Sequence, residues 1–143
     1  MKPMTLFLVG ASLLATPAIA NDDIAVMKKY GLMGKNWAID CSKPVSEKNP
    51  YSFYGVGSNG TLMETLRSTD GDKARELRNV QVISPEWILY TMIDTDKEPI
   101  NILTKIEGKR MRSWWSVGKD GTAYLINGEL NGDGGAPWFE QCN

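Results

Sequence analysis

The sequence predicts an all-β protein: an eight-stranded antiparallel up-and-down barrel, with a short N-terminal helix that plugs or flanks one end. Two observations carry this prediction. From residue 51 onward, short strand-like runs follow one another, and turn signals such as Asn59-Gly60 and Asp120-Gly121 separate them. No intervening segment is both long and helical, as the crossover between parallel strands would have to be. Strands that neighbour each other in sequence are therefore expected to pair.

The first 20 residues have the layout of a cleaved secretory signal peptide. Lys2 gives a positive start, an apolar run follows, and Ala18-Ile19-Ala20 is a small-x-small cleavage site. The apolar run is about a dozen residues long, whereas a membrane-spanning helix needs roughly 20; an uncleaved membrane anchor is the alternative. We therefore expect a signal peptide over residues 1–20 and one domain over residues 21–143, located in the periplasm or secreted.

Charge and composition narrow the classes of function. The chain has 16 Lys and Arg against 17 Asp and Glu, a net charge of −1, and no histidine. Such a balanced surface argues against nucleic-acid binding and against a polybasic membrane contact. Without histidine the chain lacks the usual general base and the commonest metal ligand. We predict no catalytic activity, no cofactor and no metal; the carboxylates Glu64, Glu86 and Asp94 would form an acid–base centre only if the fold brought them together.

The two cysteines, Cys41 and Cys142, are expected to form a disulfide, since cysteines of exported proteins usually pair. Two free thiols are the alternative, but their separation of about 100 residues is far from the C-x-x-C spacing of a redox motif. The bond would join the end of the first strand to the C-terminal tail.

The expected elements follow from local patterns. A short helix begins after Asp22-Asp23 and ends at Gly31, and the first strand alternates Trp37, Ile39 and Cys41 with polar or small residues. Seven further strands are expected over residues 51–57, 61–67, 76–83, 87–94, 100–107, 110–117 and 122–127. Residues 131–137 form a loop that returns the tail to the body. Eight strands suffice to close a barrel, although a strongly curved open sheet is the alternative.

This plan resembles the calycin group, which includes lipocalins, fatty-acid-binding proteins and avidins. The lipocalin Gly-x-Trp hallmark has one extra residue in Gly34-Lys35-Asn36-Trp37, and the Thr-Asp-Tyr motif is absent. Arg110 and Arg112 are candidates for the family's late arginine, which packs over the first-strand tryptophan. The early and terminal cysteines are also similar to those of small barrel inhibitors of C-type lysozyme, whose Ser-Gly-x-x-Tyr-like loop is missing here. The resemblance implies a barrel that carries a small apolar or amphipathic ligand.

The strand over residues 110–117 is the most unusual segment. Arg110, Arg112 and Trp114 share one side of it. If that side faces the interior, two guanidinium groups beside an indole can hold an anionic or planar ligand. If it faces solvent, which is the commoner arrangement, one arginine covers the first-strand tryptophan and the core receives Met111 and Trp115.

Aromatic residues on other strands complete the candidate ligand site. Its six members are Trp37, Tyr54, Tyr90, Arg110, Arg112 and Trp114. The strand over residues 87–94 is apolar on both faces, so one face is expected in the core and the other against the helix or another chain, a second copy included. The alternative function is a periplasmic protein-binding module, such as an envelope-enzyme inhibitor or an assembly accessory, without catalytic activity.

Overall fold

The computed structural model describes residues 19–130 and 134–143, and within them one helix and eleven strands. No helix in these ranges has the length and apolar character needed to cross a bilayer. The elements in chain order are α1 (Ile19–Lys29), β1 (Asn36–Ala38), β2 (Tyr51–Val56), β3 (Leu62–Arg67), β4 (Lys73–Ser84), β5 (Trp87–Asp94), β6 (Ile100–Glu107), β7 (Arg110–Gly118), β8 (Ala123–Ile126), β9 (Glu129–Leu130), β10 (Gly134–Gly135) and β11 (Phe139–Gln141).

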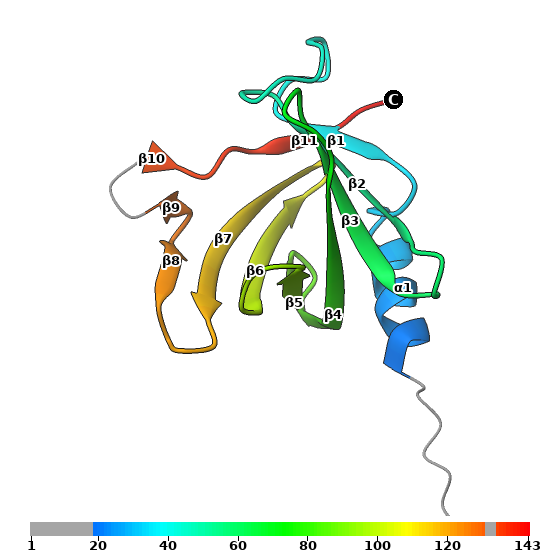
Figure 1. The fold of residues 1–143 in the computed structure, drawn as a ribbon, viewed down its shortest axis with the longest axis vertical. Helices are drawn as coiled ribbons and strands as arrows, with labels where there is room; N and C mark the ends of the chain where they lie inside the picture. Colours follow the sequence, from blue (N-terminus) through cyan, green and yellow to red (C-terminus); the bar gives the residue numbers. More distant parts are fainter. Residues whose placement is uncertain (1–18, 131–133) are drawn as a thin grey trace, which may run out of the picture.

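Eight of these strands form a closed antiparallel barrel (Figure 1). Strands β1 to β7 pair in sequence order, and β11 lies between β7 and β1. The closing register places Phe139 opposite Met111 and Trp37 opposite Gln141. The predicted eight-stranded barrel is therefore confirmed, and the open sheet is excluded. Closure leaves these strands with no long unpaired edge.

The eighth strand of the ring differs from the predicted one. Residues 123–126 do form a strand, β8, but it pairs with the C-terminal part of β7 and leads into β9 and β10 outside the ring (Figure 1). The ring is closed instead by β11, in the tail. Because β11 has only three residues and follows Pro137, alternation along the sequence cannot reveal it. Its pairing partners on both sides define it.

Helix α1 packs against the end of the barrel where β3 and β5 begin and β4 and β6 end. Met27 is fully buried and joins a cluster with Leu62, Leu77, Ile88 and Ile106 from those strands. Each of the four lies on the inward face of its strand, so the helix places apolar side chains over the barrel's interior at this end. We call it the plugged end.

A bulge in β4 receives the helix. The register between β4 and β5 shifts between Arg78 and Gln81, and Asn79 there has a φ of 55°. This irregularity frees the N–H groups of Asn79 and Val80, which donate to the buried carboxylate of Asp23 at 3.0 and 2.8 Å. A buried carboxylate thus satisfies two donors that the sheet leaves unpaired.

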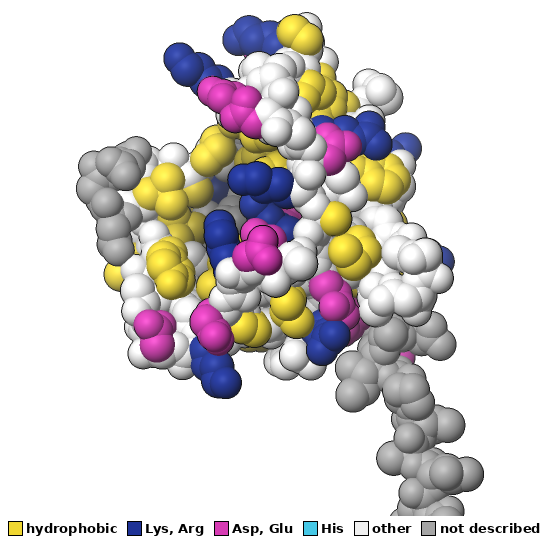
Figure 2. Space-filling model, viewed as in Figure 1, with side chains coloured by type: hydrophobic (Ala, Val, Ile, Leu, Met, Phe, Trp, Pro, Cys, Tyr) yellow, Lys and Arg dark blue, Asp and Glu magenta, His cyan; other side chains and the backbone are white. Residues whose placement is uncertain are grey.

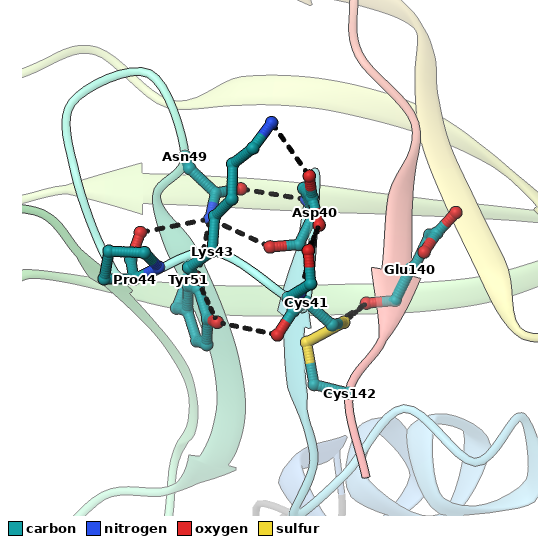
Figure 3. Close-up of a disulfide and its surroundings, with 9 residues drawn as sticks. Asp40, Cys41, Lys43, Pro44, Asn49, Tyr51, Glu140 and Cys142 are labelled. Carbon is teal, nitrogen blue, oxygen red and sulfur yellow. Dashed lines mark hydrogen bonds and ion pairs between the residues drawn. A yellow bond between two sulfur atoms is a disulfide. The ribbon is translucent and has the colours of Figure 1, made fainter.

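The predicted disulfide is present between Cys41 and Cys142, with their Cα atoms 5.4 Å apart (Figure 3). It joins the chain just after β1 to the residue that follows β11, the two strands whose pairing helps to close the ring. The loop beside it is organised by buried Asn49, whose amide donates to the carbonyls of Asp40, Lys43 and Pro44. Hydrogen bonds from Ser42 and Lys43 lower the pKa of Asp40 to about 2.

Candidate ligand site at the open end of the barrel

The end of the barrel opposite α1 is hollow. An outer cavity of about 450 Å³ lies where β4 and β6 begin and β5 ends, and an inner cavity of about 100 Å³ lies deeper between the strands. Arg75 and Met92 line both cavities and therefore form a throat between them. The remaining lining of the outer cavity is Asp94, Lys97, Glu98, Ile100 and Tyr124. Figure 2 shows basic and acidic side chains gathered around a hollow near the centre of the molecule.

At the open end, the register of β2 to β5 places polar side chains in a row across the inner wall of the barrel. Tyr54 on β2 lies opposite Glu64 on β3, Glu64 lies opposite Arg75 on β4, and Arg75 lies opposite Asp94 on β5. Residues opposite each other on antiparallel strands have their side chains on the same face. The row therefore places one guanidinium group between two carboxylates, as pairing in any other register would not.

Arg75 uses few of its hydrogen-bond donors. Its Nη1 lies 3.5 Å from Glu64 Oε2 and 3.7 Å from the thioether sulfur of Met92, and its Nε lies 3.9 Å from Asp94 Oδ2. The Nε is buried and has no hydrogen-bond partner in the described part of the chain. A guanidinium group carries five N–H donors, and buried donors are almost always satisfied. Arg75 is thus a cation at the throat with donors to spare.

The inner cavity is polar, and its hydroxyl groups are held in place. Ser52 donates to Glu64 at 2.6 Å, and the Thr104 hydroxyl lies 3.3 Å from that of Tyr90. Burial, with the Glu64 charge as the second cause, raises the pKa of Tyr54 well above its usual 10 and that of Tyr90 to about 12. Both phenols are therefore neutral hydrogen-bonding groups at physiological pH.

The charges around the two cavities balance. Arg75, Arg112 and Lys97 contribute three positive charges, and Glu64, Asp94 and Glu98 contribute three negative ones. Apolar side chains, namely Met92, Ile100 and Tyr124, lie among the charged ones in the outer cavity. The site consequently suits a molecule with an apolar part and a polar end of little net charge. A strongly charged polyanion finds no matching field here.

The structure places the six predicted ligand residues in three different environments. Tyr54 and Tyr90 face the inner cavity, and Arg112 lies at its edge. Trp37 is buried in the core, where its indole N–H donates to the Leu32 carbonyl. Arg110 and Trp114 line neither cavity. Only three of the six are therefore brought together around the hollow.

The arginine side of β7 faces outward, and the expected contact with the first-strand tryptophan is wrong. Arg110 lies 4.5 Å and Arg112 lies 5.9 Å from the ring centre of Trp138, a residue of the tail. Met111 is buried in the core as expected. Trp115 is only partly buried, because β7 has a bulge there. Ser113 lies opposite Thr104 and Trp115 lies opposite Leu103, so β7 has one extra residue between these pairs and its alternation shifts.

Sequence reasoning missed Arg75, the central residue of the site. β4 begins at Lys73, three residues earlier than predicted, so Arg75 appeared to precede the strand. Extending the period-two pattern backward from Leu77 would have placed Arg75 on the inner face. Two of the three candidate carboxylates do converge, since Glu64 and Asp94 flank Arg75, while Glu86 is exposed in the turn between β4 and β5.

Comparisons of this chain with protein-family models, with curated proteins and with solved structures found no match. The barrel and its single helix are consistent with a lipocalin-like plan, which is a statement about architecture. Within the described residues, no group of three or more His, Cys, Asp or Glu side chains is placed to hold a metal ion. The geometry of the open end must therefore carry the functional argument.

Proposed function

We propose that this protein is an exported binding protein for a small amphipathic molecule, held at the open end of the barrel. The observation that carries the proposal is Arg75, a cation with unused donors at the throat between an apolar-lined outer cavity and a polar inner one. The polar end of the ligand would accept hydrogen bonds from Arg75. Its apolar part would lie against Met92, Ile100 and Tyr124.

The cavity sizes support this assignment. Pockets that bury small organic ligands usually measure roughly 300–1,000 Å³, and the outer cavity, of about 450 Å³, lies within that range. The inner cavity, of about 100 Å³, is too small for an apolar chain but large enough for a polar group. A ligand held wholly inside the barrel, as sequence reasoning expected, is therefore less well supported than one bound in the outer cavity.

The compartment is part of the proposal. A disulfide that joins the two ends of the barrel sequence is compatible with an oxidising, extracytoplasmic location. The apolar run and small-x-small site within residues 1–20 support export. Mass measurement of the protein isolated from the cell envelope tests cleavage after Ala20. A native adduct that is lost on denaturation would identify the ligand.

Three eight-carbon probes test the role of Arg75: octanoate, octanamide and octylammonium. The first two offer oxygen acceptors and the third offers only donors, so we expect the first two to bind and the third not to. Arg75→Met should weaken octanoate and octanamide binding about tenfold, the size of a lost charge-assisted hydrogen bond. Arg78→Met is the matched control, since Arg78 lies on the same strand but is exposed and paired with Glu76.

The double variant Glu64→Gln/Arg75→Met tests whether weaker binding by Arg75→Met comes only from an unpaired buried carboxylate. It removes the buried carboxylate that Arg75→Met alone would leave without its cation. Binding measured by calorimetry should fall in the double variant as it does in Arg75→Met. Equal affinity for all three probes, or equal binding by the wild-type and both Arg75 variants, would refute the proposed site.

A further inference from the structure

The outer wall of the barrel carries a second cluster of side chains with unusual chemistry, which shares only Arg112 with the open end. Six side chains from β5, β6, β7 and the segment before β11 alternate as aromatic and cationic groups. We call this set the tryptophan–cation ladder: Trp87, Lys105, Trp114, Arg112, Trp138 and Arg110. Their order follows the contacts rather than the sequence.

The contacts of the ladder are continuous. Lys105 Nζ lies 5.6 Å from the ring centre of Trp87 and 5.7 Å from that of Trp114, and the two indoles meet edge to face at 5.6 Å. The guanidinium of Arg112 lies 5.5 Å from the ring centre of Trp114 and 5.9 Å from that of Trp138. The guanidinium of Arg110 lies 4.5 Å from the same Trp138 ring centre and ends the ladder. Distances below about 6 Å are those of cation–π contacts.

The strand register explains why these residues share the outer face. Trp87 is opposite Lys105, and Lys105 is opposite Arg112, so the three form a row across β5, β6 and β7. Their neighbours in sequence, Ile88, Ile106 and Met111, are buried in the core, which fixes the row on the outside. Trp114, two positions after Arg112 on β7, contacts Lys105 and Arg112 on this face, and the tail adds Trp138.

Acidic residues only partly neutralise the ladder. Glu107 pairs with both Lys105 and Arg110, each at 2.7 Å, and hydrogen bonds from these two groups lower the pKa of Glu107. Glu140 is the cross-strand neighbour of Arg110. Arg112 has no carboxylate partner in the ranges that the structure describes, and its Nη2 donates to the Gly128 carbonyl. The ladder's three cations therefore have two neighbouring carboxylates, and Arg112, which also lines the inner cavity, is in no ion pair within the described ranges.

Arg112 is also fixed in position. Its guanidinium lies against Gly128 and Gly135, where a Cβ atom would come within 2.6 and 2.8 Å of Nη2. A side chain that is already ordered loses little conformational entropy when a partner binds it. Tryptophan and arginine are also the residue types that contribute most to binding energy at protein interfaces. The ladder is thus a preordered surface with a cation that forms no ion pair in the described part of the chain.

We infer that the tryptophan–cation ladder binds an acidic segment of a partner protein, with carboxylates facing the ladder's cations and apolar side chains against the exposed parts of the indoles. Charge complementarity selects this occupant, because the surplus on the ladder is positive. The ladder has too few cations to bind a nucleic-acid backbone, which needs a longer row of positive charges. This inference does not depend on the ligand site at the open end.

A short peptide of alternating glutamate and phenylalanine is the probe, and the same peptide with lysine in place of glutamate is its control. Tryptophan fluorescence should report saturable binding of the acidic peptide alone. The double variant Lys105→Gln/Arg110→Gln removes two cations but keeps the three indoles and the Arg112 contact, and it should weaken binding about tenfold. Lys28→Gln/Lys29→Gln, on the exposed face of α1, makes the same change in net charge and should leave binding unchanged.

The charge-preserving variant Lys105→Arg/Arg110→Lys should retain binding, which separates loss of charge from loss of packing. The affinity of the wild-type protein should also fall as salt rises, because partly and fully exposed charges contribute to it. Equal binding of the acidic and basic peptides would overturn the inference. So would equal affinities of the two glutamine double variants, or an affinity that is unchanged when Lys105 and Arg110 are replaced.

Discussion

The two ends of the barrel are built from the same strands but have opposite interiors. At the plugged end, Met27 of α1 meets Leu62, Leu77 and Ile88 in an apolar cluster. At the open end, the same strands carry Glu64 and Arg75 inward, and two cavities lie between them. Arg75 and Leu77 are two positions apart on β4. Successive inward-facing residues of one strand therefore have different roles: Leu77 stabilises the fold, and Arg75 lines the candidate binding site.

The difference between the ends follows from what covers each of them. α1 shields the plugged end, so apolar side chains there gain the full free energy of burial. Nothing in the described residues covers the open end in the same way, and polar side chains tolerate partial contact with water. Truncation of a leucine at each end measures how unequal their stabilities are, and titration or removal of their buried polar groups tests what each end depends on.

The largest effect is expected from loss of the disulfide, which joins the chain next to β1 and β11, two strands that close the ring. Replacing both cysteines, Cys41→Ala/Cys142→Ala, frees a loop closed over 101 residues and should lower the free energy of unfolding by about 4 kcal/mol. Urea denaturation of the oxidised wild type and the variant measures it. A loss below about 1 kcal/mol would mean that the hydrogen bonds of β11 alone hold the ring closed.

A matched pair of leucine truncations compares the two ends directly. Leu77→Ala, at the plugged end, should cost about 3 kcal/mol of unfolding free energy, because the residue is 2% exposed in a packed cluster. Leu66→Ala makes the same change on β3 near the open end, where the side chain is only partly buried, and should cost about 1 kcal/mol. Equal losses in urea denaturation would contradict the contrast between the ends.

High pH should weaken the open end through its buried phenols. Folding raises the pKa of Tyr90 from 10.0 to about 12, so the neutral form stabilises the fold fully below pH 10. That contribution, up to about 3 kcal/mol, is lost as the pH rises from 10 to 12. Absorbance titration of the five tyrosines should show a late step, near pH 12, from Tyr90. Tyr90→Phe should remove part of the late step; a single transition for all five would contradict the prediction.

The last prediction concerns Asp23, a buried carboxylate at the plugged end. Asp23→Ala leaves the N–H groups of Asn79 and Val80 without an acceptor and should lower the free energy of unfolding by about 2 kcal/mol. Asp22→Ala, at the exposed neighbouring position, should change it by less than about 0.5 kcal/mol. Thermal unfolding of both variants tests the difference, and similar melting temperatures would show that the bulge of β4 needs no acceptor from α1.

Local patterns in the sequence determined most of the wall of the barrel. Alternation and turn signals predicted β5 and β6 with their correct bounds, and β2, β3 and β7 to within a residue at either end. Cysteine usage predicted the disulfide. These predictions succeeded because strand alternation and tight turns depend on residues close together in the chain.

Tertiary structure alone decided how the ring closes and where the site lies. β11 is a strand only because β7 and β1 offer it edges on both sides, and Tyr54, Glu64, Arg75 and Asp94 form a row only through the register of four strands. The bulge in β7 likewise turned Trp115 out of the core. Pairing partners and register shifts link residues far apart in sequence, and alternation along one strand contains no information about either.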